Sequence, residues 1–219
     1  MKTIRVTGKG QLKVHPDMTR ITIELEGMDW EYGETLKKSS EETEKMKDLL
    51  VPFGFERTDL KTLRFNVEPI YESYKVNDEY KRRFNGYKFT HVMKVEFDSD
   101  NKRLGKILYA LANSTLHPEF SLSYTVKDPE AVKNDLLGTA VKDAMAKAGV
   151  LSSAAGVKLG DIQSMDYSWG KVDFEVRPTN RFFGAADCMA LEAPTGYDMD
   201  IEPDDIEVED TVTVVWEIG

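Results

Sequence analysis

The chain has 219 residues, 41% of them hydrophobic and 31% charged, which is enough to bury a core in one large domain or two small ones. Its formal net charge of -10 opposes binding to nucleic acid or to an anionic membrane, and no apolar run approaches the roughly 18 residues of a membrane span. The single cysteine, Cys188, excludes an intramolecular disulfide.

Alternating apolar residues predict two strands at the start of the chain, over residues 4–14 and 21–27. We interpret them as a long hairpin around His15-Pro16-Asp17. Gly8 and Gly10 fall on inward positions of the first strand, which indicates a bend, a bulge or the close approach of another backbone. The first residues alternate in polarity and lack the apolar run of a signal peptide, so we expect a cytoplasmic protein.

Helices and strands alternate through the middle of the chain. Apolar spacing predicts helices over residues 33–51 and 104–111. Between them, strands at 63–67 and 89–97 predict a second hairpin with a long polar tip. Another strand is expected over residues 120–126.

A long helix is predicted over residues 128–155. Asp128 suits the N-cap, and Pro129 suits the first helical position because its missing N–H has no partner there. Small side chains on its apolar face would let the helix approach its neighbour closely, and Gly156 can end it. The residues expected on that buried face are Leu137, Val141, Ala144, Ala148, Leu151 and Ala155.

The last part of the chain begins with a strand near Ile162. Residues 170–204 contain prolines and glycines without periodicity and predict a long loop or arm, and residues 206–218 alternate as a final strand. The order ββαββαβαβ, loop, β predicts an α+β fold with a mainly antiparallel sheet and inserted helices. We expect one domain, which can divide into subdomains at about 1–98 and 99–219.

Four stretches of the chain, taken in order, are similar to a known family. They are VTGKGQLKVHPDMTRITIELEG, GFERTDLKTLRFNVEPIYE, FNGYKFTHVMKVEF and AVKDAMAKAGVLSSAAGVKLGDI. Together they resemble the SIMPL domain family, formerly a bacterial domain of unknown function (DUF541). Each stretch alone is a weak signal, and the specificity lies in the ordered set, which spans most of the chain.

The resemblance implies a two-part α+β fold and, in some members, assembly into large ring-like or channel-like oligomers. Family members are described as envelope or periplasmic proteins linked to oxidative stress, and one eukaryotic branch as binding a signalling kinase. The family brings no catalytic residues with it. Many exported members carry a signal peptide that is not seen here, which keeps the cytoplasm as the expected location.

Residues that could carry chemistry are interpreted structurally. His91 shares the phase of its strand's apolar residues, which predicts a core histidine rather than a metal ligand or a base. Cys188 lies in no nucleophile motif, and Gly8-Lys9-Gly10 lacks the third glycine and the helix of a phosphate loop. We expect no catalytic residue, no metal site and no cofactor. A solvated acidic edge is predicted from the alternating carboxylates Asp198, Asp200, Glu202 and Asp204.

The first functional hypothesis is a non-enzymatic oligomeric scaffold or stress-associated interaction protein, with a second copy of the chain as partner and no nucleic acid. A protein partner of another kind is left open. The alternative hypothesis is a small-ligand-binding protein, or less favoured a hydrolase, with a pocket at the second hairpin. The tyrosines expected to line that pocket are Tyr71, Tyr74, Tyr80 and Tyr87.

Overall fold

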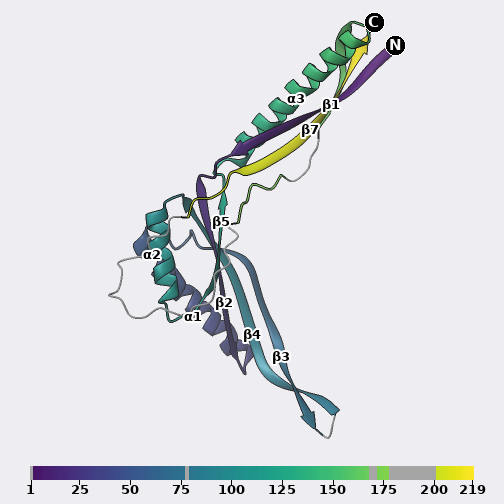
Figure 1. Ribbon diagram of the computed structural model, residues 1–219. Helices are drawn as coiled ribbons and strands as arrows, with labels where there is room; N and C mark the ends of the chain where they lie inside the picture. The colour runs from purple at the N-terminus through teal and green to yellow at the C-terminus, as the bar shows by residue number, and fades with distance from the viewer. Residues whose placement is uncertain (1, 77–78, 168–171, 178–200) are drawn as a thin grey trace. The chain divides into compact units, whose positions relative to one another are not determined.

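The computed structural model describes residues 2–76, 79–167, 172–177 and 201–219 (Figure 1). These residues form three α-helices and seven strands in two antiparallel sheets, which confirms the α+β class and the expected order of elements. The expected arm at 170–204 lies mostly outside the described residues. In chain order the elements are β1 (Lys2–Val14), β2 (Met18–Asp29), α1 (Tyr32–Leu50), β3 (Lys61–Val76), β4 (Glu79–Asp98), α2 (Asn101–Ala112), β5 (Glu119–Thr125), α3 (Pro129–Ala154), β6 (Leu159–Tyr167) and β7 (Ile206–Ile218).

The chain divides into two compact units. The first contains the described parts of Met1–Asp17, Tyr124–Val176 and Pro203–Gly219, and the second those of Met18–Ser123 and Arg177–Glu202. These bounds differ from subdomains at about 1–98 and 99–219, because the first unit takes up both ends of the chain. The two ends meet since β1 and β7 pair along their whole lengths, from Lys2 opposite Ile218 to Val14 opposite Ile206.

The first unit is a three-stranded sheet of order β1-β7-β6 with α3 lying along β1 and β7 (Figure 1). The hairpin expected between β1 and β2 is therefore wrong: β1 pairs with β7, and β2 belongs to the other sheet. His15-Pro16-Asp17 links β1 to β2. The Asp17 carboxylate accepts a hydrogen bond from the Lys127 N–H at 2.8 Å, which ties this link to the segment before α3.

Two glycines of β1 allow α3 to lie directly on the strand. A Cβ atom on Gly8 would overlap the backbone of α3 and lie 2.7 Å from the Ala144 Cβ. A Cβ atom on Gly10 would overlap the carbonyl oxygen of Leu136 and lie 3.0 Å from the Ala140 nitrogen. The sequence pattern allowed a bend, a bulge or the close approach of another backbone at these glycines. The structure shows the close approach. Real Cβ atoms cannot occupy these positions without moving the helix.

The buried face of α3 differs from the expected one. Ala144 and Ala148 are buried as expected, but Leu151 is 50% exposed and Ala155 is exposed. The buried residues repeat strictly every fourth position, at Leu136, Ala140, Ala144, Ala148 and Ser152. A row of this spacing winds slowly around a helix, so it fits a helix that lies along the strands of a twisted sheet (Figure 1). Gly156 follows with φ 68 and ends the helix as predicted.

The second unit has a four-stranded sheet of order β3-β4-β2-β5, and its core lies between this sheet and two helices. The expected second hairpin is confirmed as β3–β4, and both strands run further than the sequence pattern indicated. Most residues in the outer part of the hairpin are exposed on both faces, so they carry no apolar alternation to detect. The core residues come from β2 (Ile21, Ile23, Leu25), β4 (Phe89, Met93, Val95, Phe97), α1 (Met46, Leu50) and α2 (Leu104, Ile107, Leu111).

We predict that Gly8→Ala and Gly10→Ala each destabilise the protein by about 1–3 kcal/mol or more, because the added methyl group overlaps the backbone of α3. Gly149→Ala is the matched control, since its Cβ would meet nothing within 4 Å and alanine favours a helix by roughly 0.5–1 kcal/mol over glycine. Urea unfolding followed by circular dichroism measures both. Equal stability of the strand and helix variants would contradict this packing.

Candidate functional site: an aromatic cluster on the β3–β4 hairpin

Five aromatic rings gather where β2 ends, α1 begins and the β3–β4 hairpin leaves the sheet. Phe84 is central: its ring centroid lies 6.1 Å from Trp30, 5.9 Å from Tyr71 and 5.2 Å from Tyr87. Tyr32 extends the group by contacting Tyr87 at 5.4 Å. All four contacts are edge-to-face, the geometry that aromatic quadrupoles favour. We call these five residues the aromatic cluster.

A bulge in β4 brings two of these rings together. Tyr87 pairs with Pro69 and Phe84 with Tyr71, so β4 advances three residues while β3 advances two. Gly86 lies in the extra stretch with φ 104, a conformation that L side chains rarely adopt. A Cβ atom there would also lie 2.5 Å from the Asp29 carbonyl oxygen. The glycine therefore permits the bulge that sets Phe84 against Tyr87.

The cluster is open to solvent rather than folded into the core. Trp30 is 61% exposed, Tyr71 55% and Tyr32 49%, while Phe84 and Tyr87 are half-buried. Such a surface can bind apolar, aromatic or cationic groups through ring faces and edges.

The structure brings together two of the four tyrosines proposed from the sequence. Tyr71 and Tyr87 both contact Phe84. Tyr74 and Tyr80 lie further out on the hairpin, opposite Lys81 and Lys75, and Tyr80 is 79% exposed. The Tyr74 ring instead has a guanidinium group above it, 5.9 Å from its centroid.

Three members of the cluster were missed from the sequence: Trp30, Tyr32 and Phe84. The signal for them was present but ambiguous, because Trp30 lies between β2 and α1 and Tyr32 is the first residue of α1, where neither belongs to a periodic apolar pattern. Phe84 is three residues from Tyr87, which would place the two on opposite faces of a regular strand. The bulge in β4 instead brings the two rings into contact.

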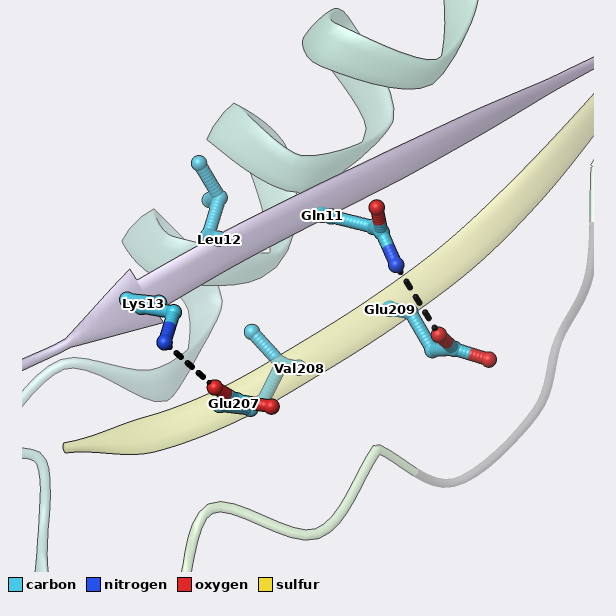
Figure 2. A pocket seen from close by; sticks show the side chains of 6 residues that line it. All are labelled: Gln11, Leu12, Lys13, Glu207, Val208 and Glu209. Carbon is cyan, nitrogen blue, oxygen red and sulfur yellow. Dashed lines mark hydrogen bonds and ion pairs between the residues drawn. The ribbon is translucent and has the colours of Figure 1, made fainter. Parts of the chain in front are cut away.

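A second candidate is the open groove of about 440 Å³ between side chains of β1 and β7 (Figure 2). Figure 2 shows Lys13 paired with Glu207 at 2.6 Å and the Gln11 amide donating to Glu209 at 3.3 Å. Lys9 pairs with the same Glu209 at 2.6 Å. Hydrogen bonding to Glu207 raises the pKa of Lys13, and bonds from Lys9 and Gln11 lower the pKa of Glu209.

These groups satisfy one another across two paired strands. Exposed ion pairs of this kind contribute little stability each, but opposite charges in register favour one alignment of β1 on β7. We interpret the groove as a structural ladder, because each of its cations already has a carboxylate partner.

His91 lies in the core of the second unit, as its phase predicted. The Thr43 hydroxyl is 3.0 Å from Nδ1 and the Thr62 hydroxyl is 2.8 Å from Nε2, so both ring nitrogens have partners. The ring also meets Phe65 edge-on. Burial, and then the charge of Lys47, lower the pKa of His91. The side chain joins α1 to β3 in its neutral form.

Two further features, a metal site and a membrane-spanning helix, are not seen among the described residues. Across the described ranges, no three His, Cys, Asp or Glu residues are grouped as metal ligands would be. None of the helices in those ranges is long and apolar enough to cross a membrane. Cys188, Asp198 and Asp200 lie outside the described residues.

Comparison with known proteins agrees with the fold. Residues 4–216 match the SIMPL family, described as a protein of unknown function (DUF541). This chain belongs to the SIMPL family. Relatives include the 26 kDa periplasmic immunogenic proteins of Brucella melitensis biotype 1 and Brucella abortus strain S19, each 29% identical over 160 residues, or 73% of this chain. An uncharacterized protein YggE of Edwardsiella ictaluri is 23% identical over 97% of this chain and 85% of its own length.

The match spans 64% of the length of each Brucella relative. The printed names of all three proteins state no enzymatic activity. Family membership thus assigns no activity, and the function is argued from the structure.

We predict that Phe84→Ala destabilises the second unit by about 1–3 kcal/mol, because it removes three ring contacts worth roughly 0.5–1.5 kcal/mol each in a partly exposed setting. Tyr80→Ala should change stability by no more than about 0.5 kcal/mol, since that side chain is largely exposed. Near-ultraviolet circular dichroism and urea unfolding report the two effects. If both variants behave alike, the cluster is not an ordered unit.

The pH dependence of His91 follows from the direction of its pKa. Because the folded pKa is lowered, the unfolded chain binds more protons, and stability present above about pH 6.5 is lost as the pH falls below it. His91→Gln keeps hydrogen-bonding groups without this titration. We expect the melting temperature of the parent protein to fall more steeply than that of His91→Gln between about pH 7 and pH 5. Parallel curves would contradict the assignment.

Proposed function

We propose that this chain is a non-enzymatic scaffold that assembles with copies of itself and binds other proteins through exposed aromatic side chains, in a stress-associated role. The observation that carries this proposal is the aromatic cluster, whose rings are ordered against one another and yet stay open to water. Ordered, exposed aromatic groups are typical of protein-binding surfaces, because they bury large areas at little entropic cost.

The composition of the aromatic cluster supports a protein partner. Tryptophan and tyrosine are enriched among the residues that dominate binding energy in interfaces, and here Trp30 and Tyr71 are more than half exposed. Arg83 adds a cation near the cluster on the same hairpin, paired with Glu72 at 2.7 Å. A partner segment with apolar and acidic side chains would match this surface.

Self-association has its own support in the first unit. Its sheet has two edge strands, β1 and β6, and all nine residues of β6 are exposed. Exposed strand edges tend to pair with other strands unless they are covered or blocked. Closed assembly would cover them and avoid open-ended polymerisation.

A small-ligand-binding protein is the second candidate, because Tyr71 and Tyr87 meet at Phe84 as two sides of one aromatic surface. A thermal-shift screen with metabolites separates the candidates. A ligand at a hundred times its Kd raises stability by about 2.7 kcal/mol, and that gain should vanish in Phe84→Ala if the cluster is the site.

The location of the protein is open to a direct test. A cytoplasmic location is part of the proposal, whereas two relatives are named as periplasmic proteins. Cell fractionation of the native host, with the chain detected by antibody, distinguishes the two compartments.

For self-association, we predict a mass clearly above 24.9 kDa by light scattering after size exclusion at about 0.15 M salt. The net charge of -10 opposes close approach of copies, so assembly should weaken as salt is lowered. A monodisperse monomer at every concentration would remove the oligomeric part of the proposal.

A further inference from the structure

Among the residues that the structure describes, β6 is an edge strand whose helix-side face is largely exposed. The β7 residues that face α3 beside it are at most 3% exposed. Their register partners on β6 are the apolar residues Ile162, Met165 and Tyr167, which are 48%, 44% and 42% exposed. Within the described ranges, α3 therefore covers β1 and β7 and leaves Ile162 and Met165 of the third strand exposed on the same face.

On its other side, α3 overhangs the free edge of β1. The Asp143 carboxylate accepts a hydrogen bond from the Lys9 N–H at 2.7 Å, which shows that this flank of the helix faces that edge. Lys147 and Leu151 follow at intervals of four residues and lie on the same flank. Leu151 is 50% exposed. A strand added beside β1 would lie beneath this leucine.

The backbone of β1 is available for such an addition over its first half. Lys9 directs its N–H away from β7, and in an antiparallel ladder every second residue points the same way. The backbone groups of Thr3, Arg5 and Thr7 therefore face the free edge. Asp143 occupies this edge only at Lys9.

Charge is segregated between the two edge strands. β1 contains four basic residues and no acidic one, whereas β6 contains Asp161 and Asp166 and no basic one. Two of the four bases pair with carboxylates of β7. Within the part of the chain that the structure describes, no ion pair involves Lys2, Arg5 or either aspartate of β6.

The unpaired charges lie at matching levels along the sheet. Because β7 pairs with both edge strands, its residues define the levels of the two. Lys2 and Leu159 both lie opposite Ile218, and Arg5 and Ser164 both lie opposite Val215. Asp161 therefore lies between the levels of Lys2 and Arg5. Both edge strands are antiparallel to β7, so they run parallel to each other.

We propose that this chain binds a second copy head-to-tail, with the β6 edge of one copy receiving the β1 edge of the next. The strands pair in parallel at equal levels, so Asp161 of one copy lies near Arg5 of the other, on the face of the sheet opposite α3. The α3 helix arriving with β1 covers the bare face of β6 and places Leu151 near Ile162 and Met165. The inference rests on the proposed self-association and names its surfaces.

The distribution of charge favours pairing of β1 with β6 over a symmetric contact between two like edges. Pairing β1 with β1 or β6 with β6 would set like charges against each other, which destabilises strand pairing. Joining unlike edges is a heterologous contact, and repeating it by rotation about an axis parallel to the strands keeps their levels and gives a ring where that rotation closes.

Cysteine cross-linking tests the contact in the full chain with Cys188→Ser as background. Arg5→Cys and Ser164→Cys lie at one level on opposite edges. Within one copy β7 separates them by two strand spacings, about 9.6 Å, which is too far for a disulfide. Under mild oxidation the double variant should give a ladder of dimers, trimers and larger species on a non-reducing gel, and each single variant should give none.

The outcomes separate this inference from the broader proposal. Dimers from either single variant would show a symmetric edge contact and overturn the inference. An oligomer by light scattering without a ladder would place the interface elsewhere, overturning the inference while self-association stands. A monomer by light scattering would overturn both.

Charge reversal provides a second readout without cysteines. Arg5→Glu and Asp161→Arg should each weaken assembly about tenfold or more, and the double variant should recover most of the loss. Lys142→Glu is the matched control, an exposed change of equal charge on α3 that should leave assembly unchanged. Circular dichroism confirms folding of each variant. Equal effects of Arg5→Glu and Lys142→Glu would overturn the inference.

Discussion

The contact between the glycines of β1 and the alanines of α3 is the constraint on which the first unit depends. Without side chains at Gly8 and Gly10, the helix backbone rests directly on the strand, and Ala140 and Ala144 fill the space that remains. Packed this closely on β1 and β7, α3 does not also cover β6. It covers β1 and β7 and leaves β6 bare, so one packing choice accounts both for the tight core and for the exposed edge.

The second unit uses a glycine for the opposite purpose. At Gly86 the backbone adopts a positive φ and adds a residue to β4, which turns Phe84 toward Tyr87 and away from a regular alternation. Its core lies elsewhere, between the sheet and two helices, and His91 is held there by two hydroxyl groups. The aromatic cluster thus lies apart from this core, and Trp30, Tyr32 and Tyr71 remain exposed.

Charge in the first unit has two different arrangements. Along the outer face of β1 and β7, lysines and carboxylates pair in register and fix the alignment of the strands that join the two ends of the chain. At the edges, Arg5 and Asp161 belong to no such ladder, and the bases and acids lie on different strands. The first arrangement is satisfied within the molecule, and the second is complementary only between molecules.

The sequence by itself determined what depends on neighbours along the chain: the α+β class, the element order, the cap at Asp128, whose carboxylate accepts from the Ala131 N–H at 2.9 Å, and the stop at Gly156. Family membership likewise followed from ordered local motifs. Tertiary structure alone decided that β1 pairs with β7 instead of β2, because alternation marks a strand but not its partner. It also decided the buried face of α3 and the membership of the aromatic cluster, since the packing of α3 on β1 and a one-residue bulge each arise from contacts between distant segments.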